Sequence, residues 1–148
     1  MHHVLFAIML AKLAEDILDR LDIFILELEE LYIPKPTLWE WIWSASVLSS
    51  WTGLKAIRRS NVTDIKIYIG MVLLFAVGPV LYALGYYLSD VWNFMDTRDI
   101  TKVEEVWQGY PVGLIWYCFL ILATQVHIFQ LLFAFKLIRY WSVRRKKE

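Results

Sequence analysis

The chain has 148 residues, of which 59% are hydrophobic and 16% aromatic, and its formal net charge is zero. Soluble domains are usually about 45–50% apolar, so this composition favours an integral membrane protein over a soluble one. The zero net charge argues against nucleic acid as the main partner. No linker-like or repeated tract divides the sequence, and we therefore expect one helical membrane domain over residues 1–148.

The first segment, residues 1–33, joins a short apolar stretch to an acidic continuation. As a helix, residues 4–14 would cover only about 16 Å, roughly half of the hydrocarbon core of a bilayer. On a helical wheel, the charges that follow fall on one face and the apolar side chains on the other. We expect an amphipathic helix, lying in the membrane interface or packed against other helices, or a degenerate fourth transmembrane helix. Pro34 and Pro36 should end it, because proline lacks a backbone N–H.

The first of three predicted transmembrane helices covers residues 38–57. Its opening tryptophans, Trp39, Trp41 and Trp43, predict an aromatic belt, with Glu40 at the water boundary. Small side chains share one face of this helix and would let another helix approach closely. They are Ser46, Ser49, Ser50 and Gly53. We favour a packing face there over serine chemistry.

The second and third predicted transmembrane helices cover residues 65–88 and 111–135. The second contains Gly78-Pro79, where we expect a kink. A polar loop, residues 89–110, separates the two helices. The third helix has no formally charged residue and would extend about 37 Å, more than the hydrocarbon core requires. A basic tail, residues 136–148, follows it.

The distribution of basic residues predicts which ends face the cytosol. If each of the three helices crosses once, the turn at 58–64 and the C-terminus lie on the same side, and that side holds most of the lysines and arginines. The positive-inside rule therefore places both in the cytosol. Asn61-Val62-Thr63 is a glycosylation sequon, and on this topology we expect it to stay unmodified.

Two groups of residues are candidates for a functional site. The intramembrane polar cluster comprises Thr124, Gln125, His127 and Gln130. Polar residues within a span often mark function, but interhelical hydrogen bonding is the interpretation we favour here. We identify no catalytic motif, no cofactor-binding residues and no metal-ligand set, since no second histidine or cysteine is spaced to complete a site with His127.

The second group is the tail, Arg144, Arg145, Lys146 and Lys147. It is typical of an anchor to anionic lipids, which attract each basic residue by about 1 kcal/mol. It also resembles a dilysine-type retrieval signal of the endoplasmic reticulum (ER), with Lys146 at the required lysine position and Arg145 departing from the pattern. The two interpretations are compatible.

The last predicted helix resembles the Jagunal family of multi-pass ER membrane proteins. The resemblance rests mainly on Ala123-Thr-Gln-Val-His-Ile-Phe-Gln-Leu131 and the basic end, with weaker support from Trp39-Glu-Trp41 and Ala76-Val-Gly-Pro-Val-Leu-Tyr82. It implies a non-enzymatic role in ER organisation and vesicle-mediated transport through the early secretory pathway, with coat-protein machinery as a partner of the tail.

Two other functional classes stay open beside this resemblance. A small four-helix membrane enzyme acting on lipophilic substrates would have a similar length, but it needs charged catalytic residues within its bundle. A transporter subunit would need a polar lining that these helices hardly offer. We also expect membrane lipids as partners, and a homo-oligomer is compatible with the sequence.

Overall fold

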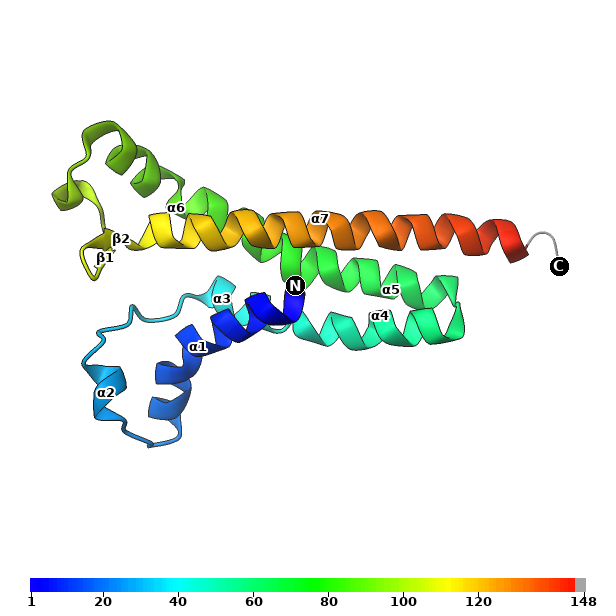
Figure 1. Ribbon diagram of the computed structural model, residues 1–148, viewed down its shortest axis with the longest axis horizontal. Helices are drawn as coiled ribbons and strands as arrows, with labels where there is room; N and C mark the ends of the chain where they lie inside the picture. Colours follow the sequence, from blue (N-terminus) through cyan, green and yellow to red (C-terminus); the bar gives the residue numbers. More distant parts are fainter. Residues whose placement is uncertain (146–148) are drawn as a thin grey trace.

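The computed structural model describes residues 1–145 as a set of helices with one short two-stranded hairpin. Figure 1 shows an elongated molecule in which α7 (Val112–Arg145) runs along nearly its whole length. The other elements are α1 (His2–Arg20), α2 (Leu26–Glu29), α3 (Leu38–Ser44), α4 (Val47–Arg59), α5 (Val62–Val72), η1 (Leu73–Val77), α6 (Gly78–Thr97), η2 (Ile100–Lys102), β1 (Val106–Trp107) and β2 (Tyr110–Pro111). The prediction of a mainly helical chain is confirmed.

Three consecutive elements, α5, η1 and α6, form one apolar helical rod over residues 62–97. The side chain of Asn61 caps its start by accepting a 2.9 Å hydrogen bond from the N–H of Thr63. η1 is a π-helical turn just before Pro79, whose missing N–H and bulky ring interrupt the regular ladder. The predicted kink therefore takes the form of a π-helical turn. The rod continues to Thr97, so the expectation of a loop over residues 89–97 is wrong.

The predicted helix over residues 38–57 is wrong as a single helix, because the structure divides it into α3 and α4. At the junction, the N–H of Ser46 donates to the carbonyl of Trp43, and the N–H of Ser49 donates to the carbonyl of Ser46, both at 2.9 Å. Hydrogen bonds between residues three positions apart are those of a 3₁₀-helix, and they tighten the backbone. The hydroxyl of Ser44 also donates to the carbonyl of Glu40 at 2.8 Å, a contact that bends helices.

The small-residue face of this segment does pack against a neighbouring helix, as predicted. Ser46, Ser49 and Gly53 are buried, and Ser50 is half-buried. A Cβ atom at Gly53 would lie 3.0 Å from the ring of Tyr68, so glycine is what lets α4 and α5 approach this closely.

The N-terminal amphipathic helix is shorter than predicted. α1 ends at Arg20 because Asp22 adopts a left-handed conformation, with φ of 55°, and the N–H of Ile23 donates back to the carbonyl of Leu18. Only the single turn of α2 is helical in the rest of residues 21–33. The buried face of α1 lies in its apolar opening and consists of His2, Leu5, Met9 and Leu13. The apolar opening therefore belongs to the core of the bundle.

The main core joins α1, α3, α6 and α7 through aromatic contacts. Trp39 and Trp43 have only 2% and 0% of their surfaces exposed, so their placement in an interfacial belt is wrong. Trp39 meets Trp116 edge-on at 4.9 Å between ring centroids, and Trp43 meets Phe119 in the same way at 5.1 Å. A second, smaller core joins α4, α5 and α7 around Ala56, Ile65, Ile69 and Ala134.

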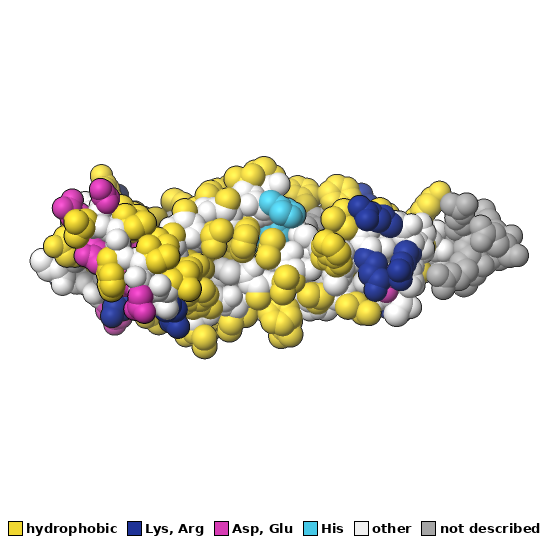
Figure 2. Space-filling model, turned by 90° about the horizontal axis from the view of Figure 1, so that it is seen from below, with side chains coloured by type: hydrophobic (Ala, Val, Ile, Leu, Met, Phe, Trp, Pro, Cys, Tyr) yellow, Lys and Arg dark blue, Asp and Glu magenta, His cyan; other side chains and the backbone are white. Residues whose placement is uncertain are grey.

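Two helices of the described chain are long and apolar enough to cross a membrane. They are the rod, Val62–Thr97, and Val112–Val143 within α7. Both carry much of their apolar surface outward, since only 33% and 28% of their most hydrophobic windows are buried. The middle of the molecule is largely hydrophobic in Figure 2, whereas charged side chains gather toward its ends.

Candidate functional site

A chain of hydrogen bonds runs through the buried middle of the bundle and joins α1, α3, the α3–α4 junction and α7. Trp43 Nε1 lies 3.1 Å from His127 Nε2, and His127 Nδ1 lies 2.8 Å from Gln130 Oε1. Gln130 Nε2 lies 3.1 Å from His2 Nδ1, and His2 Nε2 lies 3.0 Å from Ser46 Oγ. We call these five residues the buried polar chain.

The chemistry of the groups fixes the direction of this chain. The indole N–H of Trp43 can only donate, so His127 Nε2 must accept and His127 Nδ1 must carry the hydrogen. That hydrogen is donated to Gln130 Oε1, which turns the amide nitrogen of Gln130 toward His2. His2 therefore accepts at Nδ1 and donates from Nε2 to the hydroxyl of Ser46. In this arrangement both imidazoles are neutral, each with one fixed tautomer.

Burial makes the chain a strong structural constraint. His127 and His2 have 1% and 5% of their surfaces exposed, and Ser46 is fully buried. The two imidazole rings meet edge-on with centroids 5.3 Å apart. Because an unpaired polar group costs about 1–3 kcal/mol when buried, each member is held by the requirement to satisfy its neighbour. The buried polar chain fixes where α1 and α3 meet α7.

The structure divides the polar cluster that the sequence predicted. His127 and Gln130 belong to the buried polar chain. The hydroxyl of Thr124 instead donates to the carbonyl of Leu120 in its own helix at 2.7 Å, and Gln125 is exposed. In the predicted tail, Arg144 and Arg145 are the last residues of α7, while Lys146 and Lys147 lie outside the described residues.

Sequence reasoning missed three members of the chain: His2, Trp43 and Ser46. His2 and Gln130 are 128 positions apart, so no local sequence pattern predicts their contact. One signal was available, since His2, Leu5, Met9 and Leu13 recur at helical spacing, which placed His2 on the apolar face of its helix.

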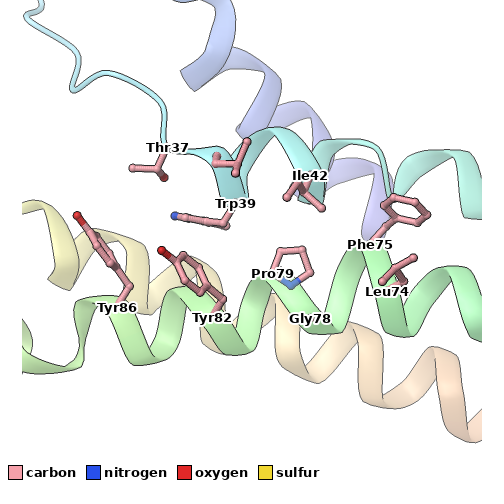
Figure 3. A pocket seen from close by; sticks show the side chains of 10 residues that line it. Thr37, Trp39, Ile42, Leu74, Phe75, Gly78, Pro79, Tyr82 and Tyr86 are labelled. Atoms are coloured by element: carbon pink, nitrogen blue, oxygen red, sulfur yellow. The ribbon is translucent and has the colours of Figure 1, made fainter.

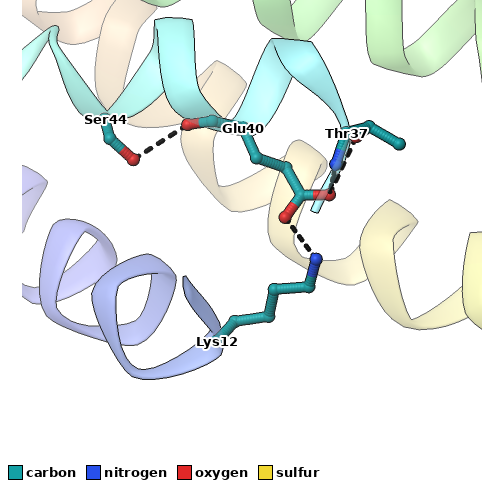
Figure 4. A network of polar contacts seen from close by, with 4 residues as sticks. All are labelled: Lys12, Thr37, Glu40 and Ser44. Carbon is teal, nitrogen blue, oxygen red and sulfur yellow. Dashed lines mark hydrogen bonds and ion pairs between the residues drawn. The ribbon is translucent and has the colours of Figure 1, made fainter. Parts of the chain in front are cut away.

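A second buried polar group lies between α1 and α3 (Figure 4). The ammonium of Lys12 donates to the carboxylate of Glu40, which has only 1% of its side chain exposed. The same carboxylate accepts hydrogen bonds from the N–H and the hydroxyl of Thr37, at 3.1 and 2.8 Å. Glu40 is therefore covered by protein and is not exposed to water, as a place in a solvated belt would require. It caps α3 and anchors α1 at the same time.

Comparisons with known proteins identify the family of this chain. Residues 1–145 match the family model described as "Jagunal, ER re-organisation during oogenesis". The chain is 47% identical to Protein jagunal of Drosophila melanogaster and 46% identical to that of Drosophila pseudoobscura pseudoobscura, in each case over 97% of this chain and 75% of the relative. It is 26% identical to human Protein jagunal homolog 1, over 78% of this chain and 63% of the human protein. The chain belongs to the Jagunal family.

Proposed function

We propose that this protein is a non-enzymatic, multi-pass membrane protein of the ER that supports ER organisation and vesicle-mediated transport in the early secretory pathway. The observation that carries the proposal is the match of residues 1–145 to a family whose description names ER re-organisation. The buried polar chain supports a structural role, because its donors and acceptors are engaged with one another.

The distribution of charge supports a cytosolic position for the end of the molecule formed by the α4–α5 turn and the end of α7. Basic side chains cluster there, including Arg58, Arg59 and Lys66 near the turn and Lys136 and Arg139 on α7. The opposite end carries the acidic side chains of the segment 90–105. By the positive-inside rule, this asymmetry favours crossing by the rod and by α7, with α3 and α4 together making a third crossing.

The partners that we propose follow from this placement. Membrane lipids surround the apolar middle of the bundle, and the basic tail, Arg144–Lys147, contacts anionic lipid or coat-protein machinery. A homo-oligomer is part of the proposal, and nucleic acid is not.

Rescue of cells that lack their own Jagunal-family protein tests the proposed role. The intact chain should restore both the ER network, seen by microscopy, and the export rate of a secretory cargo. His127→Ala should rescue at matched protein abundance, since we assign this histidine to structure. Loss of rescue by a correctly folded His127→Ala protein would contradict the non-enzymatic role, and failure of the intact chain would overturn the function itself.

The two interpretations of the tail are separated by a matched pair of variants. Lys146→Arg preserves the charge but removes the lysine that a dilysine-type signal requires, whereas replacing all four basic residues by serine also removes the charge. Escape of the Lys146→Arg protein to later compartments would support coat binding. If both variants stay in the ER, retrieval by this tail is wrong.

The proposed topology is tested at Asn61. This residue lies in the α4–α5 turn and caps α5 through its side chain, so a cytosolic turn leaves it without glycan. A mobility shift that is sensitive to endoglycosidase and disappears in Asn61→Gln would place the turn in the lumen and reverse the topology.

A further inference from the structure

An apolar groove of about 810 Å³ lies on the outer face of the bundle, between α3 and the η1–α6 part of the rod. Its volume is within the range of about 300–1,000 Å³ that small-molecule sites occupy. Figure 3 shows that ring-bearing side chains from both walls line it. Its walls include Trp39 and Ile42 on α3, Phe75 in η1, and Pro79, Tyr82 and Tyr86 on α6.

One end of the groove is polar and the other is not. Thr37, Tyr82 and Tyr86 lie at one end, and Leu74 and Phe75 lie at the other (Figure 3). The indole nitrogen of Trp39 points toward the polar end. This N–H is buried, and no hydrogen bond satisfies it within the described residues, although the hydroxyl of Tyr87 lies near it. An unsatisfied buried donor is costly, and an oxygen atom of a ligand would remove that cost.

The groove runs along the rod in the direction that a membrane lipid would take. From Leu74 to Tyr86 a helix rises by about 18 Å, which is close to the roughly 15 Å hydrocarbon depth of one leaflet. Within the charge-free part of the rod, residues 67–89, Leu74 is near the middle and Tyr86 is three residues from the end. The polar end therefore lies toward the membrane surface, where tyrosine hydroxyls are commonly found.

The chemistry of the lining restricts the occupant. Among the described residues, no charged side chain lines the groove, so a charged head group would find no counter-charge inside it. Several flat ring faces favour a rigid, flat ligand, which loses less conformational entropy on binding than a flexible acyl chain does. We propose that this groove binds a sterol-type lipid whose hydroxyl oxygen accepts the hydrogen bond of Trp39 Nε1.

Photolabelling of the purified full chain in lipid vesicles tests the proposal. The probes are a photoreactive sterol and a photoreactive phosphatidylcholine, each mapped by mass spectrometry of the labelled peptides. We expect saturable sterol labelling within residues 74–86, which unlabelled sterol displaces. Equal and equally saturable labelling of these residues by phosphatidylcholine would overturn the proposal. Cross-linking of these residues to a second copy of the chain would overturn it too.

Two glycines of the rod provide a matched pair of variants. Gly78 lines the groove, whereas Gly85 lies on the same helix outside its lining and has open space around it. Gly78→Leu should fill the groove and lower sterol labelling at least tenfold, while Gly85→Leu should leave it unchanged. Sterol labelling that is insensitive to Gly78→Leu would overturn the assignment of the site.

The predicted hydrogen bond has its own test. Trp39→Phe removes the donor and retains the ring, so it should weaken sterol competition by roughly two- to tenfold, the value of one hydrogen bond of about 0.5–1.5 kcal/mol. A deoxy analogue should compete more weakly than the sterol in the natural protein and equally well in Trp39→Phe. Trp51→Phe serves as the control because Trp51 is exposed on α4, away from the groove. A preference for the hydroxyl that survives in Trp39→Phe would refute the role of this residue.

Discussion

The ion pair between Lys12 and Glu40 allows the sharpest prediction about stability. The carboxylate of Glu40 has 1% of its side chain exposed, whereas Lys12 has 17% exposed. Removing one partner of a buried pair costs about 3–5 kcal/mol, because the other charge is left without compensation. Lys12→Met leaves the more deeply buried charge, so we expect a loss near the upper end of that range. Glu40→Gln should cost less, about 3 kcal/mol, because the Lys12 ammonium can still reach solvent.

A double-mutant cycle isolates the pair from the packing of the two side chains. In Lys12→Met/Glu40→Gln both charges are absent, so the loss should be smaller than the sum of the single losses by about 2 kcal/mol or more. The measurement is reversible unfolding in mixed detergent micelles, followed by tryptophan fluorescence. Asp16→Asn is the matched control, since it breaks an exposed pair with Arg20 on the same helix and should cost only about 0.5 kcal/mol.

If Glu40→Gln destabilised the protein no more than Asp16→Asn did, and the coupling energy lay within about 0.5 kcal/mol of zero, the pair would behave as a solvated surface pair. The Glu40 carboxylate would then not hold α1 against α3, contrary to what its burial and its hydrogen bonds with Thr37 indicate.

Three further predictions concern other parts of the molecule. Trp43→Phe should destabilise the bundle by about 1–3 kcal/mol in the same unfolding assay, because it deprives a buried imidazole of its donor; an unchanged midpoint would contradict this. Gly53→Ala should destabilise, since its Cβ would meet a ring at 3.0 Å, whereas Gly70→Ala, with open space around it, should be neutral or stabilising. Hydrogen bonds from Thr101 lower the pKa of Asp99, so their contribution to stability is lost as pH falls through the folded-state pKa. Thr101→Ala should raise that pKa in an NMR titration, and an unchanged value would refute the assignment.

The sequence predicts the apolar helices well because their signal is local. Charge-free length identifies α7, and the proline at 79 identifies the irregular turn of the rod. The division of residues 38–57 at Ser46 was not predictable in the same way. It depends on three-residue hydrogen bonds and on the contact of the Ser46 hydroxyl with a histidine 44 positions away.

The candidate site was half predictable for the same reason. His127 and Gln130 lie one helical turn apart, so an uncommon pair of polar residues within an apolar run marks them. Their partners come from the other end of the sequence, where His2 looks like an ordinary terminal residue until tertiary packing brings it to α7. For the tryptophans, the local sequence pattern was misleading. A group of tryptophans at the start of an apolar segment is typical of a membrane interface, but Trp39 and Trp43 are buried in the core.

The two buried polar groups together decide what kind of helix α1 is. Within the buried polar chain, His2 contacts His127 and Gln130, which lie near the middle of the apolar stretch Val112–Val143. Figure 1 likewise places the start of α1 beside the middle of α7. Lys12 is ten residues further along, which corresponds to about 15 Å of helix rise and roughly half of a bilayer's hydrocarbon depth. In a membrane crossed by α7, α1 therefore rises from the bilayer centre to its surface, with a hydrogen-bonded anchor at each depth. An interfacial helix would lie at one depth only, so on the proposed topology these anchors favour residues 2–12 as part of the intramembrane bundle.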